Sequence, residues 1–181
     1  MWNPLNIEPQ SFKRVIMPST ADRSRPEKKE VERMSDNNAL LLDNQLCFAL
    51  YSTSLAMTQM YKPLLEPLGL TYPQYLVLLI LWEQDGIGLK DIGERLGQKS
   101  GALTPVIKRM EQEGLVNRTR QLHDERSLSV RLTPKGQQLK AEAVKINQCL
   151  IEACGIPSRE LMEMKDKIMT LRKSLLKNQP E

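Results

Sequence analysis

Three thiols are the side chains best suited to redox chemistry in this 181-residue sequence. Cys47 stands alone in the segment 42–51, while Cys149 and Cys154 lie five residues apart towards the C-terminus. The thiolate is the reactive form of cysteine, so an accessible Cys47 is suited to oxidation, and the alternative is a small buried hydrophobic residue. The chain has no CxxC pair and His123 is its only histidine, so the sequence predicts no metal site and no cofactor.

The positive charge of the chain is concentrated in its middle. Residues 86–135 contain 10 lysines and arginines against 6 aspartates and glutamates, and the rest is balanced at 16 against 16. This excess favours a nucleic-acid partner only weakly by itself, because charged residues also form ordinary solvated surfaces. The sequence has no apolar run of about 18 residues and no secretory signal pattern, so we expect no membrane segment and a cytoplasmic protein with reduced thiols.

The elements that position these residues can be predicted from hydrophobic period and helix caps. Residues 1–38 hold four prolines and a charged stretch without apolar periodicity, and we interpret them as a mobile extension. A first long helix is expected from an N-cap at Asp43 to about residue 68. A second is expected from Thr71 or Tyr72, and its apolar run 76–82 predicts a place in the core.

Two short helices in the basic segment fit a helix-turn-helix. The first covers 89–96 and ends at Gly97, and the second is opened by Ser100 and runs to Gly114. At about 100° per residue, the apolar residues of the second helix share one side. The opposite, polar side contains Gly101, Thr104, Pro105, Lys108 and Gln112. If Ser100 is the cap of this helix, Pro105 lacks the N–H that would bond to the carbonyl of Gly101, and an irregular first turn is then expected.

Two segments with alternating polarity follow, at 115–120 and 128–132, and they flank the charged segment 121–126. Alternation with period two predicts a β-hairpin, and a hairpin directly after a helix-turn-helix is typical of a wing. The narrow minor groove of DNA attracts arginine, so we expect Arg126 to enter it while Asp124 holds the guanidinium in place. The alternative is an ordinary solvated hairpin.

Amphipathic helices are expected at both ends of residues 39–181. One helix runs from Thr133 and Pro134 to Cys154, and a last one is capped by Ser158. The predicted fold is mainly α with a small β-wing, an obligate dimer through its terminal helices. In this prediction the helices at about 41–68 and 134–177 pair with a second copy, and 86–132 contacts DNA. The alternative is packing of these helices within one chain.

These segments resemble the organic-hydroperoxide sensors of the MarR family, the OhrR type. The resemblance is carried by residues 43–51, 61–65, 70–76 and 124–126, and it covers roughly residues 41–177. It implies a winged-helix repressor that binds a pseudo-palindromic operator as a dimer. It also implies that the repressor leaves DNA when Cys47 is oxidised by an organic hydroperoxide.

The resemblance assigns roles to the tyrosines near Cys47. It implies that Tyr61 and Tyr72 of one subunit close over Cys47 of the other. The geometry agrees. Tyr61 follows Cys47 by 14 residues, roughly 21 Å along a straight helix, so it cannot reach Cys47 of its own subunit but could reach that of an antiparallel partner. Tyr51 is one turn after Cys47 on the same face, and a phenol with a pKa near 10 is a suitable donor to a thiolate. The alternative for these tyrosines is core packing.

The two-cysteine type of this family carries a resolving thiol near the end of the fifth helix. Cys149 and Cys154 are both candidates for that role, and they point about 140° apart on a helix. We favour Cys149, because Lys145 one turn earlier favours a thiolate, whereas Cys154 sits at the negative end of the helix dipole. The alternative is that both pack and that a small cellular thiol caps Cys47.

DNA contacts are assigned to the polar side of the second short helix and to the wing. Thr104, Pro105 and Lys108, with Gly101 beside them, are expected in the major groove, and Ser100 and Arg109 nearer the phosphates. We expect a regulator and no enzyme. The competing hypotheses are a MarR-type repressor that answers a phenolic or drug-like ligand and, less favoured, a thiol-dependent peroxidase, for which the sequence offers no assembled base.

Overall fold

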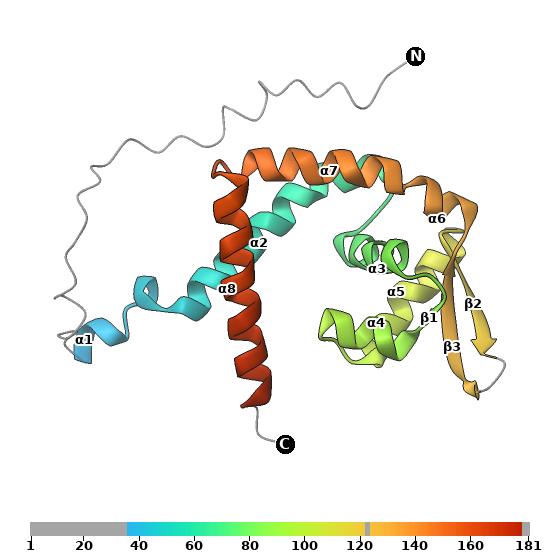
Figure 1. Ribbon diagram of the computed structural model, residues 1–181, viewed down its shortest axis with the longest axis horizontal. Helices are drawn as coiled ribbons and strands as arrows, with labels where there is room; N and C mark the ends of the chain where they lie inside the picture. The colour runs from blue at the N-terminus through green and yellow to red at the C-terminus, as the bar shows by residue number, and fades with distance from the viewer. Residues whose placement is uncertain (1–35, 122–123, 179–181) are drawn as a thin grey trace, which may run out of the picture. The chain divides into compact units, whose positions relative to one another are not determined.

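The computed structural model describes residues 36–121 and 124–178 (Figure 1). The predicted mobile extension, residues 1–38, lies outside the described residues except for its last three, which enter the short helix α1 (Asp36–Ala39). The chain divides into two compact units, with the boundary after Gln137.

The first unit holds the predicted long helix, helix-turn-helix and hairpin. Its elements are η2 (Leu42–Asn44), α2 (Leu46–Leu65), η3 (Glu66–Leu68), α3 (Tyr72–Glu83), β1 (Ile87–Gly88), α4 (Leu89–Leu96), α5 (Ser100–Gln112), β2 (Val116–Gln121), β3 (Asp124–Leu132) and α6 (Pro134–Gln138), which ends at the boundary. The second unit holds α7 (Lys140–Ala153) and α8 (Ser158–Lys177). The predicted fold class, mainly α with a small β-wing, is confirmed.

The first long helix starts later than predicted. Asp43 is not its cap but lies inside η2, where backbone N–H groups bond to carbonyls three residues back. The helix α2 begins at Leu46, after Gln45, whose side chain makes no capping bond. The Asp43 cap is therefore wrong, because the 3-10 turn already uses the backbone groups at that point. Cys47 still falls in the first turn of α2, as predicted.

The helix α3 runs through the core, as predicted. Thr71 is its N-cap, and the Thr71 N–H donates to Oε1 of Gln74 at 2.8 Å, which completes a capping box. Its side chains Val77, Leu78 and Leu81 are buried.

Among the described helices, none is long and apolar enough to cross a membrane alone. Residues 46–68 and 72–83 meet that test only together, as a pair bent by 77°.

The turn between α4 and α5 requires glycine at two positions. Gly97 ends α4 with a φ of 69°, in the left-handed region. A Cβ at Gly93 would lie 2.6 Å from the carbonyl oxygen of Gln98, whose own N–H bonds back to Gly93 at 2.8 Å. The buried face of α5 contains Leu103, Ile107 and Met110. The predicted helix-turn-helix is confirmed with its apolar side inward.

The sheet is antiparallel with the order β1-β3-β2. Arg118 of β2 faces Val130 of β3, and the register shifts between Arg120 and Gln121. Residues 124–126 were predicted in the hairpin tip, but β3 already begins at Asp124, so the tip is shorter. The strand β1 was not predicted, because two residues carry no alternation and only pairing with β3 defines them.

The helix predicted from 134 to 154 is two helices, α6 and α7, with Leu139 between them. The Gly136 carbonyl accepts a bond from Nε1 of Trp82 at 3.0 Å, and the Gly136 N–H donates to Oγ1 of Thr133 at 3.1 Å. The bond to Thr133 is local, whereas the bond from Trp82 spans 54 residues, so an apolar period does not reveal it. Ser158 is the first residue of α8 rather than its predicted cap.

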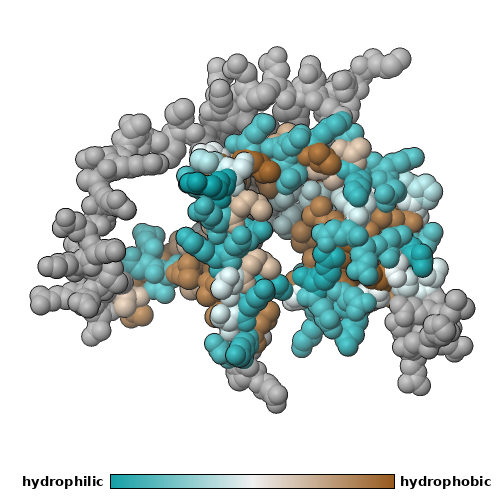
Figure 2. All heavy atoms as spheres, viewed as in Figure 1, coloured by the Kyte–Doolittle hydropathy of each residue, from teal (hydrophilic) through white to brown (hydrophobic). Residues whose placement is uncertain are grey.

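Large apolar side chains are exposed on α2 and on α8. Leu46 is 60% exposed and Leu55 47% on α2, while Met162 is 55% and Leu175 57% exposed on α8. Figure 2 shows hydrophobic surface on both helices. Exposed apolar surface of this kind marks an interaction site, and it favours the prediction that these helices bind a second copy.

Candidate redox sensor and nucleic-acid interface

Cys47 is an exposed thiol at the second position of α2. The first turn of an α-helix carries N–H groups without intrahelical acceptors and a partial positive charge, which stabilises an anion nearby. Within one chain, Cys47 is therefore not a buried packing residue. The position is therefore open to a reagent from solvent.

Three tyrosines form a cluster where α2 and α3 meet. The ring of Tyr61 lies 4.8 Å from that of Tyr72 and 5.5 Å from that of Tyr75, between ring centres. The structure thus brings two predicted site residues together and adds Tyr75, which sequence analysis missed. The spacing of three residues after Tyr72 was a signal for it, because such residues share one helix face. Tyr51 is 63% exposed, one turn after Cys47 on α2.

Two phenols of this cluster, those of Tyr72 and Tyr75, are held in their protonated form. Burial raises the pKa of Tyr72 above its ordinary value. Burial also raises the pKa of Tyr75, and the charge that Tyr72 would carry raises it further. At neutral pH both are therefore hydrogen-bond donors, which is the state needed to stabilise a thiolate or a developing oxyanion.

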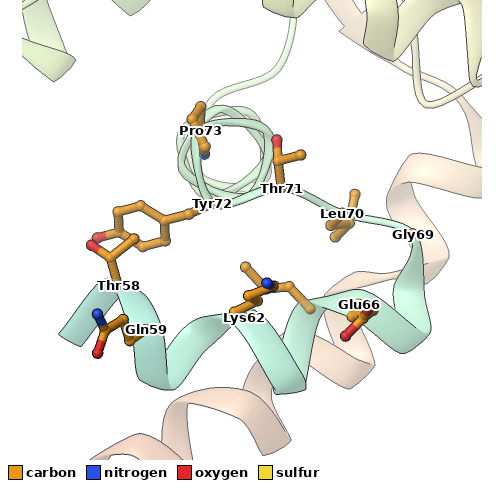
Figure 3. Close-up of a pocket in the computed structure, with 10 residues that line it drawn as sticks. Thr58, Gln59, Lys62, Glu66, Gly69, Leu70, Thr71, Tyr72 and Pro73 are labelled. Atoms are coloured by element: carbon orange, nitrogen blue, oxygen red, sulfur yellow. The ribbon is translucent and has the colours of Figure 1, made fainter. Parts of the chain in front are cut away.

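A cavity of about 510 Å³ opens beside Tyr72, between the end of α2 and the start of α3 (Figure 3). Leu65, Leu70 and Pro73 supply apolar wall, and Lys62 brings an ammonium group to it. Figure 3 shows the Tyr72 side chain extending towards Thr58. The cavity has the size and lining to take the organic part of a small molecule next to a phenol.

Gln74 is a further polar residue that sequence analysis missed. Its side chain is 1% exposed. Its Oε1 accepts bonds from the N–H and the hydroxyl of Thr71 at 2.8 and 3.0 Å, and its Nε2 donates to Oε2 of Glu113 at 2.6 Å. The Thr-x-x-Gln spacing of a capping box was visible in the sequence, but the partner 39 residues away was not.

The polar side of α5 is mostly exposed to solvent in the described part of the chain. Ser100, Gly101, Pro105, Lys108 and Arg109 are exposed, and Thr104 is half-buried. The helix α5 begins at Ser100, as predicted, and Lys99 is its N-cap. The helix continues through Pro105, and Thr104 Oγ1 donates to the Ser100 carbonyl at 3.1 Å. Nε of Arg109 donates to Oε1 of Glu113 at 2.9 Å.

The hairpin is anchored to the end of α5 by one ion pair. Nε of Arg118 donates to Oε2 of Glu111 at 2.8 Å, and the Arg118 N–H donates to Oε1 at 3.1 Å. These hydrogen bonds, the side-chain bond foremost, hold the pKa of Glu111 below its ordinary value. Asp124 and Arg126 lie in β3, but their side chains are outside the described part of the chain, so their pairing stays a prediction.

The two candidate resolving thiols lie at the end of the second unit's first helix. Cys149 is exposed on α7, and Cys154 is the half-buried C-cap. Nζ of Lys145 donates to both carboxylate oxygens of Glu142, at 3.0 and 3.1 Å. Lys145, on which the preference for Cys149 partly rests, is thus paired with Glu142, while Cys154 sits at the C-terminal end of the helix as expected, and the choice of Cys149 stays a prediction.

Comparisons with known proteins give one consistent family. The family described as "Transcriptional regulator SarA/Rot" matches residues 59–143. The "Organic hydroperoxide resistance transcriptional regulator" of Bacillus subtilis (strain 168) is 47% identical over 134 residues, 74% of this chain and 91% of its own. The "HTH-type transcriptional regulator TtmR" of Methylorubrum extorquens (strain PA1) is 40% identical over 150 residues, 83% and 77% of the two chains.

Solved structures agree with the sequence relatives. Reduced AbfR bound to DNA matches with a TM-score of 0.63 at 40% identity, over 75% of this chain and 95% of that one. Disulfide-formed AbfR matches with a TM-score of 0.53 at 42% identity, over 74% and 89%. AbfR is a protein of Staphylococcus epidermidis.

The fold and the open face of α5 define a winged-helix transcriptional regulator. Within that class, the chain belongs to the MarR-type family that includes the B. subtilis organic hydroperoxide resistance regulator. These relatives are regulators rather than enzymes, which confirms the prediction of a regulator.

Proposed function

We propose that this chain is a redox-sensing transcriptional repressor whose Cys47 detects organic hydroperoxides. The observation that carries the proposal is the exposed thiol in the first turn of α2, in a chain 47% identical to an organic hydroperoxide resistance regulator. The AbfR structures in reduced and disulfide forms describe a relative whose cysteines change oxidation state.

The sensing step is an oxidation with a balanced proton count. The Cys47 thiolate attacks the terminal oxygen of the hydroperoxide, the one that carries hydrogen, so an S–O bond forms while the O–O bond breaks. Cys47 becomes a sulfenic acid, and the leaving alkoxide takes a proton and departs as the alcohol. Tyr61 and Tyr72 are the proposed donors, and the cavity beside Tyr72 gives room for the organic group. A second thiol, Cys149 or Cys154, then condenses with the sulfenic acid and releases water.

The proposed active form is a dimer on double-stranded operator DNA. The exposed apolar side chains of α2 and α8 supply the surface for a second copy. The polar side of α5 enters the major groove through Gly101, Thr104, Pro105 and Lys108, and Ser100 and Arg109 lie nearer phosphates. We place the protein in the cytoplasm, where its DNA lies and where thiols are kept reduced between oxidative events.

Operator binding with and without oxidant tests the proposal. The DNA is a duplex that the reduced protein selects from a randomised library, and the oxidant is cumene hydroperoxide. We expect wild type to leave DNA at about one equivalent of oxidant per Cys47, and Cys47→Ser to bind equally well and stay bound. Ser52→Ala, on the same helix, is the matched control that still dissociates. A Cys47→Ser protein that dissociates under peroxide contradicts the proposal.

A second candidate function is a repressor released by a phenolic ligand, and the cavity beside Tyr72 favours it. Salicylate added to Cys47→Ser bound to the same DNA separates the two. Release by salicylate without any oxidant supports the ligand-responsive function. If salicylate releases no protein, the redox function stands.

A further inference from the structure

A buried amide joins the tyrosine cluster to the DNA-facing helix. Gln74 stands between Tyr72 and Tyr75 in the first turns of α3, and its side chain is almost completely buried. Its amide oxygen belongs to the capping box with Thr71, and its amide nitrogen donates to Glu113, the residue that caps α5. One side chain therefore holds both the start of the helix that carries two cluster tyrosines and the end of the helix that faces DNA.

Glu113 distributes this contact over the end of α5. Its Oε2 accepts from Gln74 at 2.6 Å, its Oε1 from Arg109 at 2.9 Å, and its carbonyl from Nζ of Lys135 at 2.8 Å. Arg109 lies on the exposed face that is proposed to meet phosphates. The orientation of its guanidinium therefore depends on a carboxylate that Gln74 holds in place.

The hydrogen bond from Gln74 is sensitive to small displacements of α3. A charge-assisted bond is strong at 2.6 Å, and it is no longer a hydrogen bond once the two atoms are about 1 Å further apart. Any change that shifts the backbone of Thr71 and Tyr72 also moves the Gln74 amide, because the capping box ties them together. Such a shift releases Oε2 of Glu113.

We propose that Gln74 is a positioning residue that transmits the state of the tyrosine cluster to α5 through Glu113. This inference rests on the proposed function, since it assumes that oxidation of Cys47 disturbs Tyr61 and Tyr72. In the reduced protein the bond to Glu113 holds α5 and Arg109 in the DNA-binding arrangement. In the oxidised protein the first turn of α3 shifts and the bond is lost.

Gln74→Glu separates this role from helix capping. The substitution keeps the volume and the oxygen that accepts from Thr71, but it places a carboxylate oxygen against Glu113 where a donor stood. The double variant Gln74→Glu with Glu113→Gln restores one donor and one acceptor in reversed order and has the net charge of wild type. Gln84→Glu, at the exposed C-cap of the same helix, adds the same charge without facing Glu113.

The measurement is the dissociation constant for the selected duplex, for the reduced protein and after stoichiometric cumene hydroperoxide. Loss of the Cys47 thiol is followed in parallel. We expect Gln74→Glu to weaken binding of the reduced form by about tenfold or more, which corresponds to about 1.4 kcal/mol. Its oxidised form should bind as oxidised wild type does, and its thiol should react at the wild-type rate. The double variant and Gln84→Glu should bind within about threefold of wild type in both forms.

The outcomes separate the inference from the proposed function. Equal weakening of both forms of Gln74→Glu, or no recovery in the double variant, overturns the inference and leaves a purely structural role. Wild type that binds equally before and after oxidation overturns the proposed function instead. If Gln74→Glu does not fold, Glu113→Gln replaces it, because one amide oxygen cannot accept from both Gln74 and Arg109. It should lose affinity in the reduced form alone, and an equal loss in both forms, or no loss, overturns the inference.

Discussion

Two glycines in helices should respond in opposite directions to the same methyl group. Gly136→Ala places a Cβ 2.2 Å from the carbonyl oxygen of Leu115 and 3.1 Å from Cδ2 of Leu132. Gly101→Ala, in α5, places its Cβ where no atom lies within 4 Å. Neither glycine has a positive φ, so only packing distinguishes the two positions.

The loss of stability in Gly136→Ala follows from the backbone that the added Cβ would meet. The Leu115 carbonyl accepts bonds from the N–H and the hydroxyl of Thr133, both at 3.1 Å, and the Gly136 carbonyl accepts from Trp82. Moving α6 away costs about 1–3 kcal/mol for overpacking and about 1 kcal/mol for a lost hydrogen bond. Alanine returns about 1 kcal/mol in helix propensity, so we expect a net loss of about 1–3 kcal/mol.

Gly101→Ala should instead stabilise the protein by about 0.5–1 kcal/mol while weakening operator binding, because its methyl group lies on the face proposed for DNA. Urea unfolding measures the stability of both variants, at one fixed protein concentration because dimerisation makes stability concentration-dependent. Operator titration measures the loss of DNA binding in Gly101→Ala. The packing argument is refuted by a Gly136→Ala protein as stable as wild type, or by equal destabilisation in both variants.

Three further predictions concern the wing, the ion pair behind it and the resolving thiol. Arg126→Ala should weaken operator binding more than tenfold and flatten the slope of log affinity against log salt by about one, and an unchanged slope contradicts minor-groove insertion. The folded-state pKa of Glu111 lies below its unfolded value, so its bond to Arg118 stabilises fully above the unfolded pKa and is lost as pH falls through the folded pKa. The difference in unfolding free energy between wild type and Glu111→Gln should therefore shrink from pH 7 to pH 3, and a constant difference refutes that reasoning. Non-reducing electrophoresis after peroxide should show a crosslinked dimer that one of Cys149→Ser and Cys154→Ser abolishes, whereas no crosslink in wild type would exclude a resolving thiol.

Much of the fold was determined by local sequence. Apolar period and glycine stops predicted α3, α4 and α5, because hydrophobic spacing near 3.6 and a left-handed glycine such as Gly97 are properties of the segment itself. Alternation predicted β2 and β3 for the same reason. The placement of Cys47 in a first turn also followed from the sequence, although the cap at Asp43 was wrong because a 3-10 turn intervened.

Tertiary structure decided the features that depend on partners distant in sequence. The strand β1 exists only through its pairing with β3, and the separation of α6 from α7 accompanies the bond from Trp82 to Gly136, 54 residues away. The hydrogen bond between Gln74 and Glu113 joins residues 39 positions apart, so no local pattern predicts it. A local pattern specifies which groups a residue offers, and the packing of distant segments determines which partner each group meets.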